Sequence, residues 1–195
     1  PVYMLVHDAL YDLPHPYAAQ DLQAFSGSTL LCRSAFALGR ALDWIPDVIH
    51  LHDWPTALAA TMLETIESAP PFDRTASVLT IHNLAHQPWF DPAGIAIAQL
   101  PQALFHPGVL ENFGAVNPMK GGMAYATLLT TVSPTYAEEI RHPPASSGLE
   151  ILINARTDRL VGITNGIDTD VWNPATDPLI WSPYSADDIE RKSDC

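Results

Sequence analysis

The chain has 195 residues, a length typical of one domain with part of a second. Hydrophobic residues make up 47% and charged residues 16%, which excludes a disordered chain and is enough apolar material for a core. Nine Lys and Arg against 22 Asp and Glu give a formal charge of −13, which argues against nucleic acid and anionic membrane as partners because such a chain repels phosphate groups. A local basic pocket for one small anion stays compatible with this charge.

The cysteines, the longest uncharged stretch and the start of the chain exclude further classes of protein. Cys32 and Cys195 form no CxxC pair, which excludes a disulfide scaffold and a cysteine zinc knuckle and fits a reducing compartment. The uncharged stretch 92–110 is interrupted by prolines and is no membrane helix. The chain opens on Pro1, without a signal peptide, directly before an apolar run. We therefore expect a piece of a longer protein, located in the cytoplasm.

Short runs rich in Val, Ile and Leu predict strands that are buried on both faces. In chain order these predicted strands are 2–6, 48–52, 77–82, 128–132 and 160–164.

Helical patterns lie between the predicted strands. Residues 29–42 place leucines on one stripe, and 54–66 follow Asp53 as a predicted N-cap. Ser133 and Pro134 predict another cap before a helix over 135–141. Strands that alternate with helices predict an α/β fold with a doubly wound, mostly parallel, Rossmann-like sheet.

Three of these strands end in polar residues, at the edge where parallel sheets bind ligands. The second ends in His52-Asp53-Trp54, the third in His82-Asn83 and the last in Asn165-Gly166. Each has an ordinary alternative: a helix cap for Asp53, a satisfied core histidine for His82 and a turn for Asn165-Gly166. Together, imidazole, carboxylate and amide groups at one edge suit a polyhydroxylated ligand.

Metal and cofactor motifs are weak or missing. Asp168-Thr169-Asp170 is a DxD triplet, for which a solvated turn is the better interpretation. His50 and His52 share one face of a strand, but no third ligand stands at a suitable spacing, so we reject a metal site there. Dinucleotide, P-loop, zinc-protease and serine-hydrolase motifs are absent from the sequence.

Lys120-Gly121-Gly122 opens a helix of small residues after Asn117-Pro118. Its lysine is able to pair with an anion and its glycines to admit a ligand backbone. Tight packing of the helix explains the two glycines at least as well.

Six ordered blocks now make the chain resemble bacterial glycogen synthase and plant starch synthase. Tyr11-Asp12 with Pro16-Tyr17 also resembles the family's sugar-site loop. The blocks are His52-Asp-Trp-Pro-Thr-Ala-Leu58, Thr80-Ile-His-Asn-Leu-Ala-His-Gln87, Asn117-Pro-Met-Lys-Gly-Gly122, Thr130-Thr-Val-Ser-Pro-Thr-Tyr-Ala137, Gly162-Ile-Thr-Asn-Gly-Ile-Asp168 and Trp172-Asn-Pro-Ala-Thr-Asp177.

The resemblance implies a retaining glycosyltransferase of the two-domain GT-B type. Such an enzyme moves glucose from ADP-glucose, or from UDP-glucose in some relatives, to an α-1,4-glucan without a metal or another cofactor. His82 would be the catalytic residue, bonding the transferring glucose and helping to stabilise developing charge. The implied substrate-binding residues are Tyr17, Asp53, Trp54, Asn83 and Asn165. Residues 1–177 would be part of the N-terminal, acceptor-side domain, and 178–195 the start of the interdomain connection.

The chain departs from the family pattern at several points. The family's His-Asp-Trp-His reads His52-Asp53-Trp54-Pro55 here, and Ala-Tyr-Gln-Gly reads Ala85-His86-Gln87-Pro88. The family's first loop and its second domain, which carry the ligands of the nucleotide diphosphate, would lie outside this chain. We therefore expect no glucosyl transfer by the chain alone, and marginal stability with self-association.

Two other functions stay open. One is a glucan-binding or regulatory module that uses the synthase fold without chemistry. The weaker one is a sucrose- or trehalose-type transferase acting on a small acceptor, against which the blocks at 80–87 and 130–137 argue.

Overall fold

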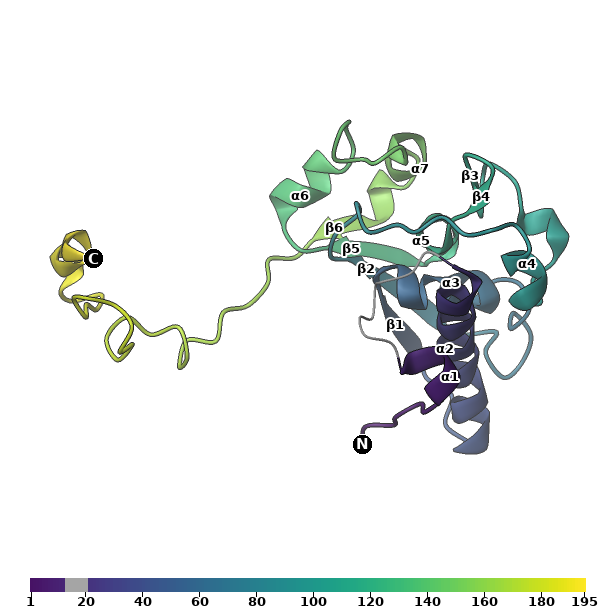
Figure 1. Cartoon of the computed structure of the whole chain (residues 1–195), viewed down its shortest axis with the longest axis horizontal. Helices are drawn as coiled ribbons and strands as arrows, with labels where there is room; N and C mark the ends of the chain where they lie inside the picture. Colours follow the sequence, from purple (N-terminus) through teal and green to yellow (C-terminus); the bar gives the residue numbers. More distant parts are fainter. Residues whose placement is uncertain (13–20) are drawn as a thin grey trace. The chain divides into compact units, whose positions relative to one another are not determined.

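The structure is a computed structural model that describes residues 1–12 and 21–195 (Figure 1). It contains two compact units, Pro1–Ile163 and Thr164–Cys195, which are described separately. The first unit contains α1 (Asp8–Tyr11), α2 (Leu22–Ala41), β1 (Val48–His52), α3 (Asp53–Leu63), β2 (Ala76–Ile81), α4 (Gly94–Ile97), η1 (Gln102–Leu104), β3 (Glu111–Asn112), β4 (Ala115–Val116), α5 (Pro118–Tyr125), β5 (Leu128–Thr131), α6 (Pro134–Glu139), α7 (Glu150–Asn154), η2 (Thr157–Arg159) and β6 (Leu160–Gly162).

The main sheet has four parallel strands in the order β1-β2-β5-β6. His52 lies opposite Thr80, and Thr80 lies opposite Thr130, so the carboxyl ends of these three strands share one edge. The parallel α/β fold predicted from the sequence is confirmed, and four of the five predicted strands occur within two residues of their expected bounds.

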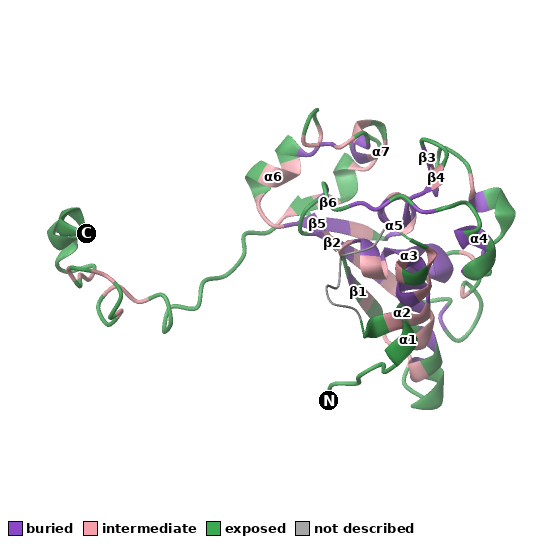
Figure 2. Cartoon of the chain, in the orientation of Figure 1, coloured by how far each residue is buried: buried purple, intermediate pink, exposed green. Residues whose placement is uncertain are grey.

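The core forms where helices cover this sheet. Helix α3 packs against β1, β2, α2 and α5, while α6 packs against β5 and β6. Figure 2 shows buried residues along α3, α5 and the middle strands. Leu58, Met62, Leu79 and Leu129 are all fully buried, which anchors α3 on the sheet.

Capping residues set where several helices begin. Ser133 Oγ accepts a hydrogen bond from Tyr136 N at 2.9 Å, so the predicted cap of α6 is confirmed. Helix α2 begins at Leu22, seven residues before its predicted start, because Asp21 caps it by accepting from Ala24 N at 2.9 Å. The interior Gly27, which weakens a helical pattern, fits there because Tyr11 packs against it and donates to its carbonyl at 2.7 Å.

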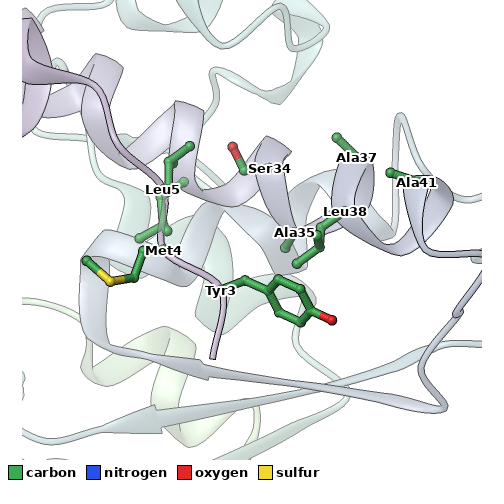
Figure 3. Close-up of a pocket in the computed structure, with 9 residues that line it drawn as sticks. Tyr3, Met4, Leu5, Ser34, Ala35, Ala37, Leu38 and Ala41 are labelled. Atoms are coloured by element: carbon green, nitrogen blue, oxygen red, sulfur yellow. The ribbon is translucent and has the colours of Figure 1, made fainter. Parts of the chain in front are cut away.

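The predicted strand over 2–6 is wrong. These residues form neither helix nor strand, and Val2 and Met4 are 91% and 84% exposed. A strand needs a neighbour for its backbone hydrogen bonds, and an apolar pattern alone does not supply one. Tyr3, Met4 and Leu5 instead line a groove of about 500 Å³ over the 34–41 part of α2 (Figure 3).

A small hairpin of β3 and β4 follows the long connection after β2, and Phe90 bridges to Val116 on its other edge. The second unit, Thr164–Cys195, consists of turns and ends in the short helix η3 (Ile189–Asp194). In the part of the chain that the structure describes, no helix is long and apolar enough to cross a membrane.

Candidate functional site

The carboxyl ends of β1 and β2 bring His52, Asp53 and His82 into contact. His52 Nδ1 lies 3.0 Å from His82 Nε2, and Asp53 Oδ1 accepts from His82 N at 2.8 Å. Both imidazoles are exposed and Asp53 is half-buried. The prediction that polar strand ends of β1 and β2 meet at one edge is therefore confirmed.

Asp53 is not the helix cap that its position predicts. Its φ is +53°, it is the first residue of α3, and its carboxylate reaches across the sheet to His82 N, with Asn83 N at 3.5 Å. The helix start is stabilised instead by Thr56, whose Oγ1 accepts from His52 N at 2.6 Å and donates to His52 O at 2.9 Å. A left-handed backbone costs a residue with a Cβ about 1–2 kcal/mol, so the fold accepts strain to aim this carboxylate.

The contact between His52 and His82 couples the protons of the two rings. Of two neutral imidazoles in this contact, one donates and the other accepts. Partial desolvation of the His52 ring by its neighbours, followed by the charges of His50 and His82, lowers the pKa of His52 from its usual 6.5, while Asp53 opposes the shift. The neutral form of His52 is thus favoured near neutral pH. The exposure of His82 excludes its alternative as a buried core histidine.

A chain of polar side chains leads from this pair across the sheet. His50 Nε2 lies 2.7 Å from Thr80 Oγ1, which lies 2.6 Å from Thr130 Oγ1. The ring centroids of His50 and His52 are 4.3 Å apart, as expected for residues two apart on one strand face. His52 was expected at this edge as part of a polar strand end, and His50 was considered only as a metal ligand. The contact of the His52 ring with His82 and the bonds of Thr80 and Thr130 were not predicted, although the His-x-His pattern and both threonines were visible signals.

Two predicted residues of the same blocks have other surroundings. Trp54 is only 5% exposed and its ring lies 5.7 Å from that of Phe90, so it belongs to the core beneath the site. Asn83 is exposed, and its Oδ1 accepts from Ala85 N at 3.0 Å, which shapes the loop after β2.

The geometry of Lys120-Gly121-Gly122 favours the packing interpretation. Lys120 Nζ donates to Glu111 O at 2.7 Å, and burial lowers the pKa of Lys120 while the Glu111 charge opposes that shift. A Cβ at Gly121 would overlap a Leu110 methyl group, and one at Gly122 would lie 2.7 Å from both the Cβ and the carbonyl oxygen of Ala57. The glycines therefore let α5 approach α3 closely.

Two predicted residues remain, Tyr17 and Asn165. Tyr17 lies outside the described residues. Asn165 belongs to the second unit, where Asp168 Oδ1 accepts from the backbone of Asp170 and Val171 at 3.1 Å each, the geometry of a turn.

The described strand ends contain no group of side chains suited to a metal ion, and the groove of Figure 3 is lined by other residues. Within residues 1–12 and 21–195, no group of three or more His, Cys, Asp or Glu side chains is arranged to hold a metal ion. The groove on α2 is lined almost entirely by apolar side chains and by none of the predicted site residues, so it is no candidate for the chemistry of a polar ligand.

A family model, curated relatives and a solved structure all relate this chain to glycogen and starch synthases. A family model for the starch synthase catalytic domain matches residues 1–155. Glycogen synthase 2 of Geobacter sulfurreducens is 44% identical over 99% of this chain and 41% of its own, and glycogen synthase of Thermotoga maritima is 39% identical over 97% and 39%. The solved catalytic domain of starch synthase IV from Arabidopsis thaliana, bound to ADP and acarbose, has a TM-score of 0.73 at 32% identity, over 94% of this chain and 36% of its own.

A parallel α/β unit with a polar site at its strand ends, superposing on a starch synthase catalytic domain, defines part of a GT-B fold. This chain belongs to the glycogen and starch synthase family. It spans about two fifths of the length of the relatives that it matches.

Proposed function

We propose that this chain is the acceptor-side part of a retaining glucosyltransferase that elongates an α-1,4-glucan, glycogen or starch, from ADP-glucose. Family membership supports the reaction class. The observation that carries the proposal is His82, exposed at the end of β2 and held by two neighbours, Asp53 through its backbone and His52 through its ring.

His82 has a ring nitrogen left for substrate. Among the described residues its Nδ1 makes no hydrogen bond, while Nε2 faces His52. When His52 Nδ1–H donates to His82 Nε2, His82 carries its own proton on Nδ1 and offers a fixed donor to a sugar oxygen. A fixed donor at the reacting glucose stabilises charge that develops during transfer, without reorganisation.

The other predicted residues take supporting roles in this proposal. Asp53 fixes the backbone of His82, and Trp54 supports both from the core. Asn83, Tyr17 and Asn165 are proposed to bind sugar hydroxyl groups on the acceptor side.

The donor is proposed to bind mainly outside this chain. The diphosphate and base ligands would lie in segments of a longer protein, so the 195-residue chain alone should bind ADP-glucose weakly and transfer no glucose. The ADP in the Arabidopsis structure supports an adenosine diphosphate sugar as the donor. The proposed location is the cytoplasm, or the plastid in a plant or alga.

Glucose incorporation into glycogen tests the proposal, with ADP-glucose and UDP-glucose assayed side by side on the full-length protein. We expect transfer from ADP-glucose, and His82→Ala should lower kcat by about 10²–10³-fold, the usual loss for one transition-state donor. The affinity for glycogen and the melting temperature should change little, because His82 is exposed. Proton NMR of the new linkage should show the α configuration, as retention requires.

His142→Ala is the matched control, since His142 is an exposed histidine paired with Glu138 at the end of α6. If His82→Ala melts earlier but keeps its activity per folded molecule, the catalytic role is wrong. If the full-length protein binds glycogen and transfers glucose from neither donor, the non-catalytic glucan-binding module replaces the enzyme.

A further inference from the structure

Two aromatic rings form an exposed pair in the part of the chain that follows β2. Trp89 is 48% exposed and Phe113 is 76% exposed, and their ring centroids lie 5.9 Å apart at an interplanar angle of 55°. Trp89 comes from the loop after β2 and Phe113 from the turn between β3 and β4 (Figure 1). Exposed apolar groups that touch each other mark interaction surfaces more often than single exposed residues do.

The loop that carries Trp89 is held firmly. Its neighbour Phe90 exchanges two backbone hydrogen bonds with Val116, of 2.9 and 2.8 Å, and the buried Phe90 ring packs against Phe25 at 5.1 Å. On the other side of Trp89, Gln87 Nε2 donates to Ser147 O at 3.0 Å. Because the backbone on both sides of Trp89 is held by these bonds, binding at its ring needs little ordering of the backbone.

Phe113 occupies a position that folding does not favour for it. Its φ is +52° and that of Gly114 is +84°, the pattern of a two-residue hairpin turn that prefers Asn-Gly. A phenylalanine there carries a cost of about 1–2 kcal/mol. With 76% of its surface exposed, its ring recovers little of that cost by burial in the chain. The combination points to a contact made outside the chain.

The net charge of the chain and the proposed reaction both favour a glucan as the ligand of this aromatic pair. A net charge of −13 disfavours anionic ligands, whereas a pyranose ring is neutral and has apolar C–H faces that fit against aromatic rings. Trp89 follows His82 by seven residues, so their Cα atoms are at most about 25 Å apart. The pair is therefore within reach of a glucan chain whose end lies at His82.

We propose that Trp89 and Phe113 form a glucan-binding surface that holds an α-1,4-glucan beside the candidate active site. This inference rests on the proposed function for its ligand.

Native electrophoresis of the 195-residue chain in gels with and without glycogen tests the surface, together with maltoheptaose titration by tryptophan fluorescence. We expect glycogen to retard the chain, and Trp89→Ala and Phe113→Asn to weaken binding about tenfold or more, as for aromatic anchors of binding sites. Phe113→Asn is the decisive variant because asparagine suits the left-handed turn and preserves the fold. Trp181→Ala is the control, since Trp181 is 93% exposed in the second unit.

Unchanged binding in both variants, or a parent chain that glycogen does not retard, overturns the surface. If Phe113→Asn turns a dimer into a monomer in sedimentation and leaves glycogen binding intact, the pair is a contact between copies and the proposal is wrong. The transfer assay separates the two proposals: Phe113→Asn should raise the KM for glycogen and keep kcat. Retardation without any transfer would leave the surface standing while the proposed reaction fails.

Discussion

A single methyl group at Gly122 should separate two helices and destabilise the fold. An alanine Cβ there would lie 2.7 Å from the Cβ and carbonyl oxygen of Ala57 and 3.0 Å from its Cα. These are atoms of the α3 backbone or fixed to it, so no rotation of a side chain relieves the overlap. Helix α5 must therefore move away from α3, which opens space between two buried faces.

The expected loss follows from two opposing terms. Alanine improves the helix by about 1 kcal/mol over glycine, whereas overpacking a core costs about 1–3 kcal/mol and sometimes more. With backbone atoms in the overlap we expect the upper part of that range, a net loss of about 2 kcal/mol. For a chain of this size that lowers the melting temperature by about 4–8 °C. Gly121→Ala should cost less, because a Leu110 methyl group can rotate away.

Urea unfolding followed by circular dichroism measures this order, with Gly166→Ala as the control because nothing lies within 4 Å of its added Cβ. The expected ranking of destabilisation is Gly122→Ala, then Gly121→Ala, then Gly166→Ala near zero. A Gly122→Ala chain as stable as its parent, with weakened ligand binding, would refute the packing argument and return these glycines to a ligand site.

Three further outcomes follow from the structure. Because folding lowers the pKa of His52, the unfolded chain binds more protons than the folded chain below about pH 6.5, so stability should fall as the pH drops through that range. His52→Asn should reduce the difference between the urea midpoints at about pH 7.5 and about pH 5, and an unchanged difference would contradict the shift. Burial raises the pKa of Cys32 to about 12, so iodoacetamide at about pH 8 should label only the exposed Cys195 of the folded chain, and rapid double labelling in mass spectra would show that Cys32 is accessible. Among the described strands β1 pairs only with β2, so its other edge is unpaired, and Val48 is 52% exposed; the isolated chain should therefore self-associate in sedimentation. Val48→Lys should reduce this association, and equal association of the variant would place the contact elsewhere.

The strands were predictable where an apolar run was bounded by turn residues on both sides. Residues 48–52, between Pro46-Asp47 and Asp53, meet that condition, and the structure has a strand there. Residues 2–6 have the same pattern and form no strand, because pairing depends on a neighbour that a local pattern does not specify. The first turns of α2 were missed for a different reason: Gly27 weakens the helical pattern, and only the tertiary contact with Tyr11 shows why a glycine fits there.

The candidate site was predictable as a location more than as a set of contacts. Parallel strands bring their carboxyl ends to one edge, so the meeting of His82 with the end of β1 followed from the order of the elements. The bond between the rings of His52 and His82 depends on rotamers and on register, which place His52 opposite Thr80. The sequence therefore predicted that His52 and His82 stand at the same edge, and it did not predict that the His52 ring contacts and orients His82.

Asp53 shows how the fold and the site constrain each other at one residue. Its position after a strand and before a helix is typical of a cap, and a cap needs no positive φ. In the structure the φ angle of Asp53 is +53°, and Thr56 Oγ1 donates to His52 O at the start of the helix. The Asp53 carboxylate accepts from His82 N instead. Glycine would fit this backbone with less strain but would leave His82 N without its acceptor. The strain at Asp53 is thus explained by the orientation of His82, which links the local cost in folding to the proposed chemistry.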